Sequence, residues 1–173
     1  QAQNMRSLRH SIKAKAVKKN SSQKTNSLKV KALIERKTVY FENAGEENTA
    51  TLLKLAKDHA EAEGIRDIVV ASTRGNTGVA ASKLFKGFNV VVVTHHVGFS
   101  EPGVPELTER IRKQILKNGA KIFTATHVLS GVERAIRKKF GTIMPLEIMA
   151  HTLRLFGEGT KVCVEITIMA ADA

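Results

Sequence analysis

The run Asn89-Val90-Val91-Val92-Val93-Thr94 constrains the fold more than any other stretch of the chain. It is apolar without alternation, and a strand of this kind is buried on both faces, as in a parallel sheet covered by helices. Shorter apolar runs at 67–71 and 121–125 are separated from it by helical patterns. Strands that alternate with helices predict an α/β fold of three layers, α/β/α, with a mostly parallel, doubly wound sheet.

Other elements are predicted around these three strands. They are a short strand at 38–41 and helices at 49–63, 79–85, 105–117, 131–140 and 145–156. Pro105 is expected to open its helix, and Ser130 and Glu133 have the spacing of a capping box. The last residues, 161–173, alternate like a strand but also suit one face of a helix.

The segment 68–78 is typical of a strand, a tight turn and a helix N-terminus. Free backbone N–H groups and the helix dipole favour an anion at such a turn. The alternative is an ordinary βα connection without a ligand. The glycines of this segment match neither the Gly-x-Gly-x-x-Gly fingerprint nor the phosphate loop of nucleotide triphosphatases. A terminal phosphate therefore fits the turn better than a dinucleotide or a triphosphate.

In parallel sheets, ligands bind at the carboxyl ends of the strands. Four loops, 42–48, 72–78, 94–103 and 126–131, are expected to share that edge. The sequence therefore predicts that a small phosphate-bearing molecule binds there. The expected binding residues are Glu42, Asn48, Ser72, Thr73, Arg74, Gly75, Asn76, Thr77, Gly78, Thr94, His95, His96, Gly98, Thr126, His127, Ser130 and Gly131.

Three of these residues are histidines. His95 and His127 are candidates for acid–base catalysis, because imidazole titrates near neutrality. The alternative is that they orient loops through hydrogen bonds. His95 and His96 are adjacent, and adjacent side chains on an extended backbone point to opposite sides. Since no carboxylate or cysteine partner is defined for them, no metal site is predicted.

Most of the net charge of +12 lies near the N-terminus. Residues 1–37 hold 11 Lys and Arg against the single acid Glu35, whereas the rest of the chain is nearly neutral. We expect 1–37 to be a basic extension that buries too little apolar surface to fold, followed by one domain over 38–173. A transit-type leader and a nucleic-acid-binding arm are the alternatives. Nucleic acid is disfavoured, because no aromatic residue interleaves the charges.

Compartment and redox state are constrained by a few features. No apolar run is long enough to span a bilayer, so no membrane association is expected. Cys163 is the only cysteine, which excludes an intrachain disulfide. It lies between two valines and is expected to be a buried small hydrophobe. A cytoplasmic location is expected, or an organelle if 1–37 is a leader.

Several short motifs together resemble those of a known family. They are Val39-Tyr40-Phe41-Glu42, Glu47-Asn48-Thr49, Val69-Val70-Ala71-Ser72-Thr73, Val93-Thr94-His95-His96-Val97-Gly98-Phe99, Thr124-Ala125-Thr126-His127-Val128-Leu129-Ser130-Gly131-Val132-Glu133-Arg134-Ala135-Ile136 and Lys161-Val162-Cys163-Val164-Glu165. The turn at 72–78 resembles one in the C-terminal domain of pyruvate kinase. Residues 38–173 resemble the small stand-alone proteins called pyruvate kinase alpha/beta domain-like. The resemblance implies their fold, no pyruvate kinase catalytic residues, and flavin mononucleotide (FMN) as the phosphate-bearing cofactor.

The resemblance also implies two departures from that family. Residues 1–37 have no counterpart in it, and its members continue past the position of Ala173 into two further strands. This comparison implies a helix at 161–173 and an open sheet edge. Open edges pair with other chains, so a homo-oligomer through that edge is expected. Three functions stay open: a binder of a phosphate-bearing molecule, a flavin- or histidine-dependent enzyme, and a nucleic-acid binder acting through residues 1–37.

Overall fold

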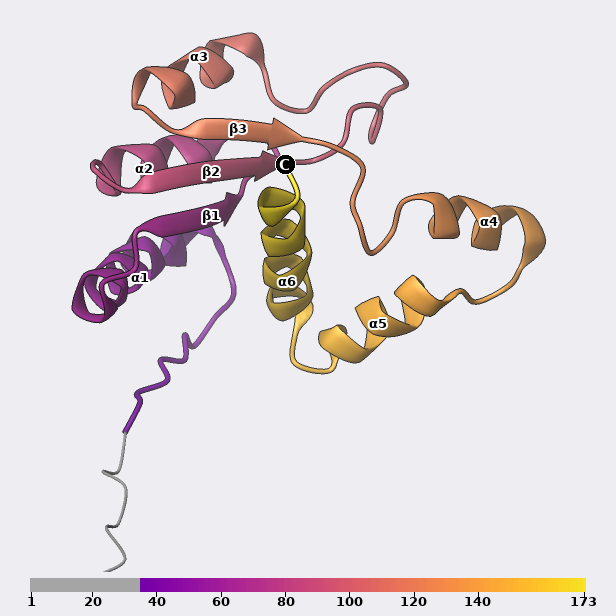
Figure 1. Ribbon diagram of the computed structural model, residues 1–173, viewed down its shortest axis with the longest axis horizontal. Helices are drawn as coiled ribbons and strands as arrows, with labels where there is room; N and C mark the ends of the chain where they lie inside the picture. Colours follow the sequence, from indigo (N-terminus) through magenta and orange to yellow (C-terminus); the bar gives the residue numbers. More distant parts are fainter. Residues whose placement is uncertain (1–34) are drawn as a thin grey trace, which may run out of the picture. The chain divides into compact units, whose positions relative to one another are not determined.

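Three parallel strands form the sheet, in the order in which they occur along the chain (Figure 1). The computed structural model describes residues 35–173, and all helices and strands lie in the unit Phe41–Ala173. The strands are β1 (Asp67–Ala71), β2 (Asn89–Thr94) and β3 (Lys121–Thr124). The helices are α1 (Thr49–Glu63), α2 (Asn76–Leu84), α3 (Glu109–Lys117), α4 (Val132–Phe140), α5 (Pro145–Arg154) and α6 (Glu158–Ala171), and a 3₁₀ turn covers Glu46–Asn48. The predicted α/β fold with a parallel sheet is confirmed.

Helices cover both faces of this sheet (Figure 1). On one face, Phe85 at the end of α2 and Ile115 of α3 form a core with Val92 of β2. On the other face, Ile166 of α6 packs with Val93. Neighbouring residues of β2 thus point into two different cores, which is why this strand is apolar throughout.

The winding of the sheet differs from the prediction. Each described strand is added on the same side of the one before it, so right-handed crossovers place α2 and α3 on the same face. A doubly wound sheet needs a reversal of strand order, and the three described strands have none. Helix α6, which follows the last described strand in the chain, covers the second face instead.

The boundaries of several elements match the patterns, and others do not. Helix α1 and strand β2 cover the predicted residues, and residues 161–171 are helical. The strand predicted at 38–41 is not formed. Among the described strands, β1 pairs only with β2, so residues 38–41 have no strand partner. Helix α3 begins at Glu109 rather than at Pro105, with Thr108 as its N-cap residue.

The predicted capping box of α4 is not formed. Gly131 is the N-cap residue, and no side chain caps this helix. Glu133 instead accepts a hydrogen bond from the backbone N–H of Leu146 at 2.7 Å, and Arg137 forms an ion pair with Glu147. Glu133 therefore helps to join α4 to α5 rather than to cap α4.

Two predictions concern membrane association and the edges of the sheet. None of the helices described between residues 35 and 173 has the length and apolar composition needed to cross a membrane. Strands β1 and β3 each pair on one side among the described residues, and oligomer formation through an edge stays a prediction. The predictions for the basic segment fall almost wholly on residues 1–34, outside the described part.

Candidate functional site

The carboxyl ends of the three strands lie at one edge of the sheet. The hydroxyl groups of Thr94, at the end of β2, and Thr124, at the end of β3, are hydrogen-bonded to each other. Loops 72–78, 94–103 and 126–131 leave from these ends. Loop 42–48 follows no described strand, and the side-chain amide of Asn48 donates to the Asn43 carbonyl within that loop.

Two cavities open at this edge. The first, which we call the α6 cavity, has a volume of about 250 Å³ and lies between the strand ends and α6. Ser72, Thr73 and Thr94 contribute hydroxyl groups to it, and Lys161 and Glu165 of α6 contribute opposite charges. The α6 cavity is therefore polar at the strand ends and carries a buried ion pair on its helical side.

The second cavity, which we call the α4 cavity, has a volume of about 470 Å³ and lies at the N-terminus of α4. Thr126, Ser130 and Gly131 line it from the preceding loop, and Arg134 and Lys138 line it from the helix. Among its described lining residues none is acidic, so the charges around this cavity are all positive. Phe99, His127 and Arg134 line both cavities, which are thus adjacent.

The structure brings only part of the predicted binding set to these cavities. The predicted residues that line one or both are Ser72, Thr73, Thr94, His95, His96, Gly98, Thr126, His127, Ser130 and Gly131. Glu42, Asn48, Arg74, Gly75, Asn76, Thr77 and Gly78 line neither.

The turn before α2 has a packing role that explains this division. Gly75 has φ of 93°, and a Cβ atom there would lie 2.3 Å from Cγ2 of Ile111 in α3. A Cβ at Gly78 would lie 2.8 Å from Cγ1 of Val92. Ser72 Oγ accepts the Gly78 N–H at 3.0 Å and so holds the start of α2. The two glycines let α2 approach the sheet and α3 closely.

A buried charge network supports the loop after β3. Lys161 and Glu165 of α6 are 4% and 2% exposed and form an ion pair. Glu165 Oε1 also accepts the Leu129 N–H at 3.0 Å, and its Oε2 lies 3.8 Å from His127 Nδ1. One carboxylate therefore connects α6 with the loop that carries His127.

The helical contributors to the site were not predicted from the sequence. Arg134 and Lys138 are four residues apart on α4, and Lys161 and Glu165 have the same spacing on α6. This spacing places each pair on one face of its helix. Arg134 is half-buried, and both Arg134 and Lys138 line the α4 cavity.

The three histidines lie together where the two cavities meet. Ring centroids are 4.4 Å apart for His95 and His96, 4.4 Å for His95 and His127, and 5.4 Å for His96 and His127. The expectation that His95 and His96 point apart is wrong. Strand β2 ends at Thr94 and a turn begins at Val97, so the alternation of a strand does not apply to them.

Burial changes the protonation of two of these rings. It lowers the pKa of His95, and the charge of neighbouring His96 adds to the effect. Burial also lowers the pKa of His127, although Glu165 acts in the opposite direction. Both rings therefore favour the neutral form in the folded chain more than in the unfolded chain.

We expect the free energy of unfolding in the presence of EDTA to fall as the pH drops below about 6.5, the ordinary pKa of histidine. Below this pH, His95 and His127 bind protons more readily in the unfolded chain than in the folded chain. Acid therefore favours unfolding. Urea denaturation at several pH values measures how steeply the free energy of unfolding changes with pH. This pH dependence should be weaker in the H95Q/H127Q variant. It should be unchanged in H59Q/H151Q, which replaces two exposed histidines. Equal slopes in both variants would contradict the assignment.

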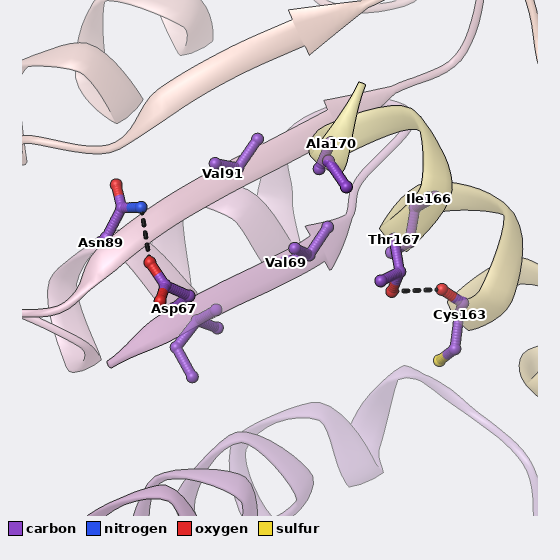
Figure 2. Close-up of a pocket in the computed structure, with 10 residues that line it drawn as sticks. Asp67, Val69, Asn89, Val91, Cys163, Ile166, Thr167 and Ala170 are labelled. Atoms are coloured by element: carbon purple, nitrogen blue, oxygen red, sulfur yellow. Dashed lines mark hydrogen bonds between the residues drawn. The ribbon is translucent and has the colours of Figure 1, made fainter. Parts of the chain in front are cut away.

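A third cavity, of about 520 Å³, lies between α6 and strands β1 and β2 (Figure 2). Val69 and Val91 of the strands line it with Ile166 and Ala170 of α6. Cys163 also lines it and is exposed, so its expected burial is wrong. No cationic side chain is found among its described lining residues, which makes it a poor candidate for a phosphate.

Comparison with known proteins does not support the expected family. No family model matches the chain. It is similar to O-ureido-L-serine synthase, with 21% identity over 57% of this chain and 31% of that chain and a TM-score of 0.33. It is also similar to a hydrogen sulfide-producing enzyme from Fusobacterium nucleatum, with 20% identity over 54% of this chain and 28% of that chain and a TM-score of 0.33.

The predicted membership in the pyruvate kinase alpha/beta domain-like family is therefore wrong: no family model matches the chain, and the solved structures to which it is similar are an O-ureido-L-serine synthase and a hydrogen sulfide-producing enzyme. The physical reason is that the shared motifs are short strand–turn–helix segments. Such segments recur wherever parallel strands connect to helices, so they indicate the local structure more than the family. The chain spans about a third of the length of the proteins it matches.

Proposed function

We propose that the chain binds a small phosphate-bearing molecule in the α4 cavity. The observation that carries this proposal is the charge of the cavity: Arg134 and Lys138 line it without any acidic side chain among the described lining residues. None of the ion pairs between described residues involves Arg134, so its guanidinium group can form one with a ligand. Arginine and lysine beside an anion form charge-assisted hydrogen bonds, which are stronger than neutral ones.

The start of α4 adds backbone donors to these cations. The first N–H groups of a helix have no intrahelical acceptor. Gly131 is the N-cap residue of α4, and no side chain caps this helix. The positive end of the helix dipole lies at the same place. Thr126 and Ser130, which line the cavity, add hydroxyl groups. A phosphate at this position would meet cations, backbone donors and hydroxyl donors together.

The non-phosphate part of the ligand would lie toward the adjacent α6 cavity. Phe99 lines both cavities and offers an aromatic surface to a planar group. FMN fits a phosphate site that lies beside an aromatic surface, since it carries one terminal phosphate and a planar ring. When bound, FMN would supply hydride or electron transfer. Arg134 and Lys138 would hold its phosphate, and Phe99 would contact its ring.

The test compares FMN with riboflavin, which has the same ring without the phosphate, by fluorescence titration of the full chain. FMN should bind and riboflavin should bind much more weakly. The R134Q/K138Q variant should bind FMN more than about 100-fold more weakly, because each of the two lost charged hydrogen bonds contributes about 1.5–3 kcal/mol.

The matched control is K113Q/K117Q, which removes two exposed cations at the same spacing on α3. It should leave the affinity unchanged. If both double variants weakened FMN binding equally, the loss would be an effect of net charge, and the proposed location of the phosphate in the α4 cavity would be contradicted. If FMN fails to bind, competition between inorganic phosphate and a fluorescent phosphate ester tests the cavity without the flavin. Absence of both activities would reject the proposed function.

A further inference from the structure

We propose that His95, His96 and His127 form a binding site for Zn²⁺ where the α4 and α6 cavities meet. One ring nitrogen from each of these half-buried histidines lies within 4.8 Å of the other two. Zinc ligated by imidazole at about 2.0–2.1 Å holds its nitrogens about 3.3 Å apart in a tetrahedral site. The rings are already in contact, so small rotations of the side chains bring the nitrogens to that separation. The three zinc ligands are not among the proposed phosphate ligands, so zinc binding does not depend on the phosphate site.

An unsatisfied atom points to the same site. His95 Nδ1 is buried and has no hydrogen-bond partner within the described part of the chain. Buried polar atoms nearly always have a partner, and each exception needs an explanation. A metal ion would use the lone pair of this nitrogen. The ring stays at this position through its contacts with His127 and with Phe99, whose centroid is 3.9 Å away.

Glu165 provides an outer carboxylate for the site. Its Oε2 lies 3.8 Å from His127 Nδ1, which leaves Nε2 of His127 as the nitrogen for the metal. Histidine ligands commonly donate their other ring N–H to a carboxylate, which orients the ring and raises its basicity. Glu165 is itself held by Lys161 and by the Leu129 N–H, so its position is fixed before a metal binds.

Three protein ligands leave one position of a tetrahedral ion open. Zinc sites with three histidines and an open position bind water or a substrate there. The open position here would face one of the two cavities that His127 lines. Arg134, which lines both cavities, would attract an anionic group toward the ion.

The experiment uses the full chain freed of metal with EDTA. Isothermal titration with Zn²⁺ should give one ion per chain, and Co²⁺ should give the visible absorption of a tetrahedral site. H96Q should weaken Zn²⁺ binding by more than about 100-fold, because even loss of an outer partner costs about 10–100-fold. E165Q should weaken it by about 10–100-fold. H59Q and H151Q change exposed histidines elsewhere and should bind like the wild type.

Circular dichroism separates loss of binding from loss of folding, and His96 is only half-buried, so H96Q should remain folded. Failure of the wild-type chain to bind Zn²⁺ would overturn the proposal. So would equal affinities in the wild type and in the H95Q/H96Q/H127Q variant, because the bound ion would then be held elsewhere. An unchanged affinity in E165Q would overturn the role of that carboxylate.

Discussion

Replacing Lys161 by methionine is expected to reduce the free energy of unfolding by about 3–5 kcal/mol, because removal of one partner of a buried ion pair leaves an uncompensated charge. Lys161 is 4% exposed, and Glu165, its partner, is 2% exposed. Methionine is close to lysine in length, so the substitution removes the charge and leaves most of the packing. Urea denaturation at neutral pH measures the loss.

Two further variants isolate the effect of burial. K54M removes the lysine of an exposed pair with Asp58 at the same helical spacing, and it should leave the denaturation midpoint almost unchanged. K161M/E165M replaces both buried charges by apolar side chains and should be more stable than K161M alone, since apolar replacement of a whole buried pair is often neutral or stabilising. Equal losses in K161M and K54M would show that the pair is not buried in solution.

Replacing Phe85 by alanine is expected to cost about 3–5 kcal/mol, the usual cost of removing a large aromatic side chain from a core. Phe85 is 1% exposed and packs edge-on against Phe88, with the ring centroids 5.4 Å apart. It lies in the core that α2 and α3 form with the sheet. Thermal or urea unfolding measures the change.

The matched control for this prediction is F140A. Phe140, the last residue of α4, is 68% exposed, so its loss should change the free energy of unfolding by about 0.5 kcal/mol or less. A loss in F140A as large as that in F85A would mean that the end of α4 is buried in solution. The pair of variants therefore tests whether the core lies on the α2 and α3 face.

The parts of the fold that were predictable depend on local patterns. The apolar run of β2 and the periodic apolar face of α1 each carry their own signal, and both elements are confirmed. The strand at 38–41 was wrong because a strand also needs a partner, which no local pattern shows. Residues 161–173 were ambiguous because their apolar residues fit both periods, and packing of α6 on the sheet decides for the helix.

The site was predictable only at the strand ends. Polar residues after β2 and β3 were expected there because the carboxyl ends of parallel strands share one edge. The contribution of α4 and α6 depends on how those helices pack, so Arg134 and Lys161 could not be assigned to it. The meeting of His95 with His96 was missed because the strand alternation was extended past Thr94, where the strand ends.

The contribution of α6 to the site has a consequence for how binding relates to folding. The wall of the α6 cavity combines strand ends from the middle of the chain with α6, and Glu165 of α6 joins the two through the Leu129 N–H. The wall of the α6 cavity is not complete until α6 docks on the sheet. A ligand or ion bound there stabilises only the docked state, so its binding energy adds to the stability of the whole domain by thermodynamic linkage. Binding at the site therefore increases the fraction of chains in which α6 is docked on the sheet, and undocking of α6 weakens binding.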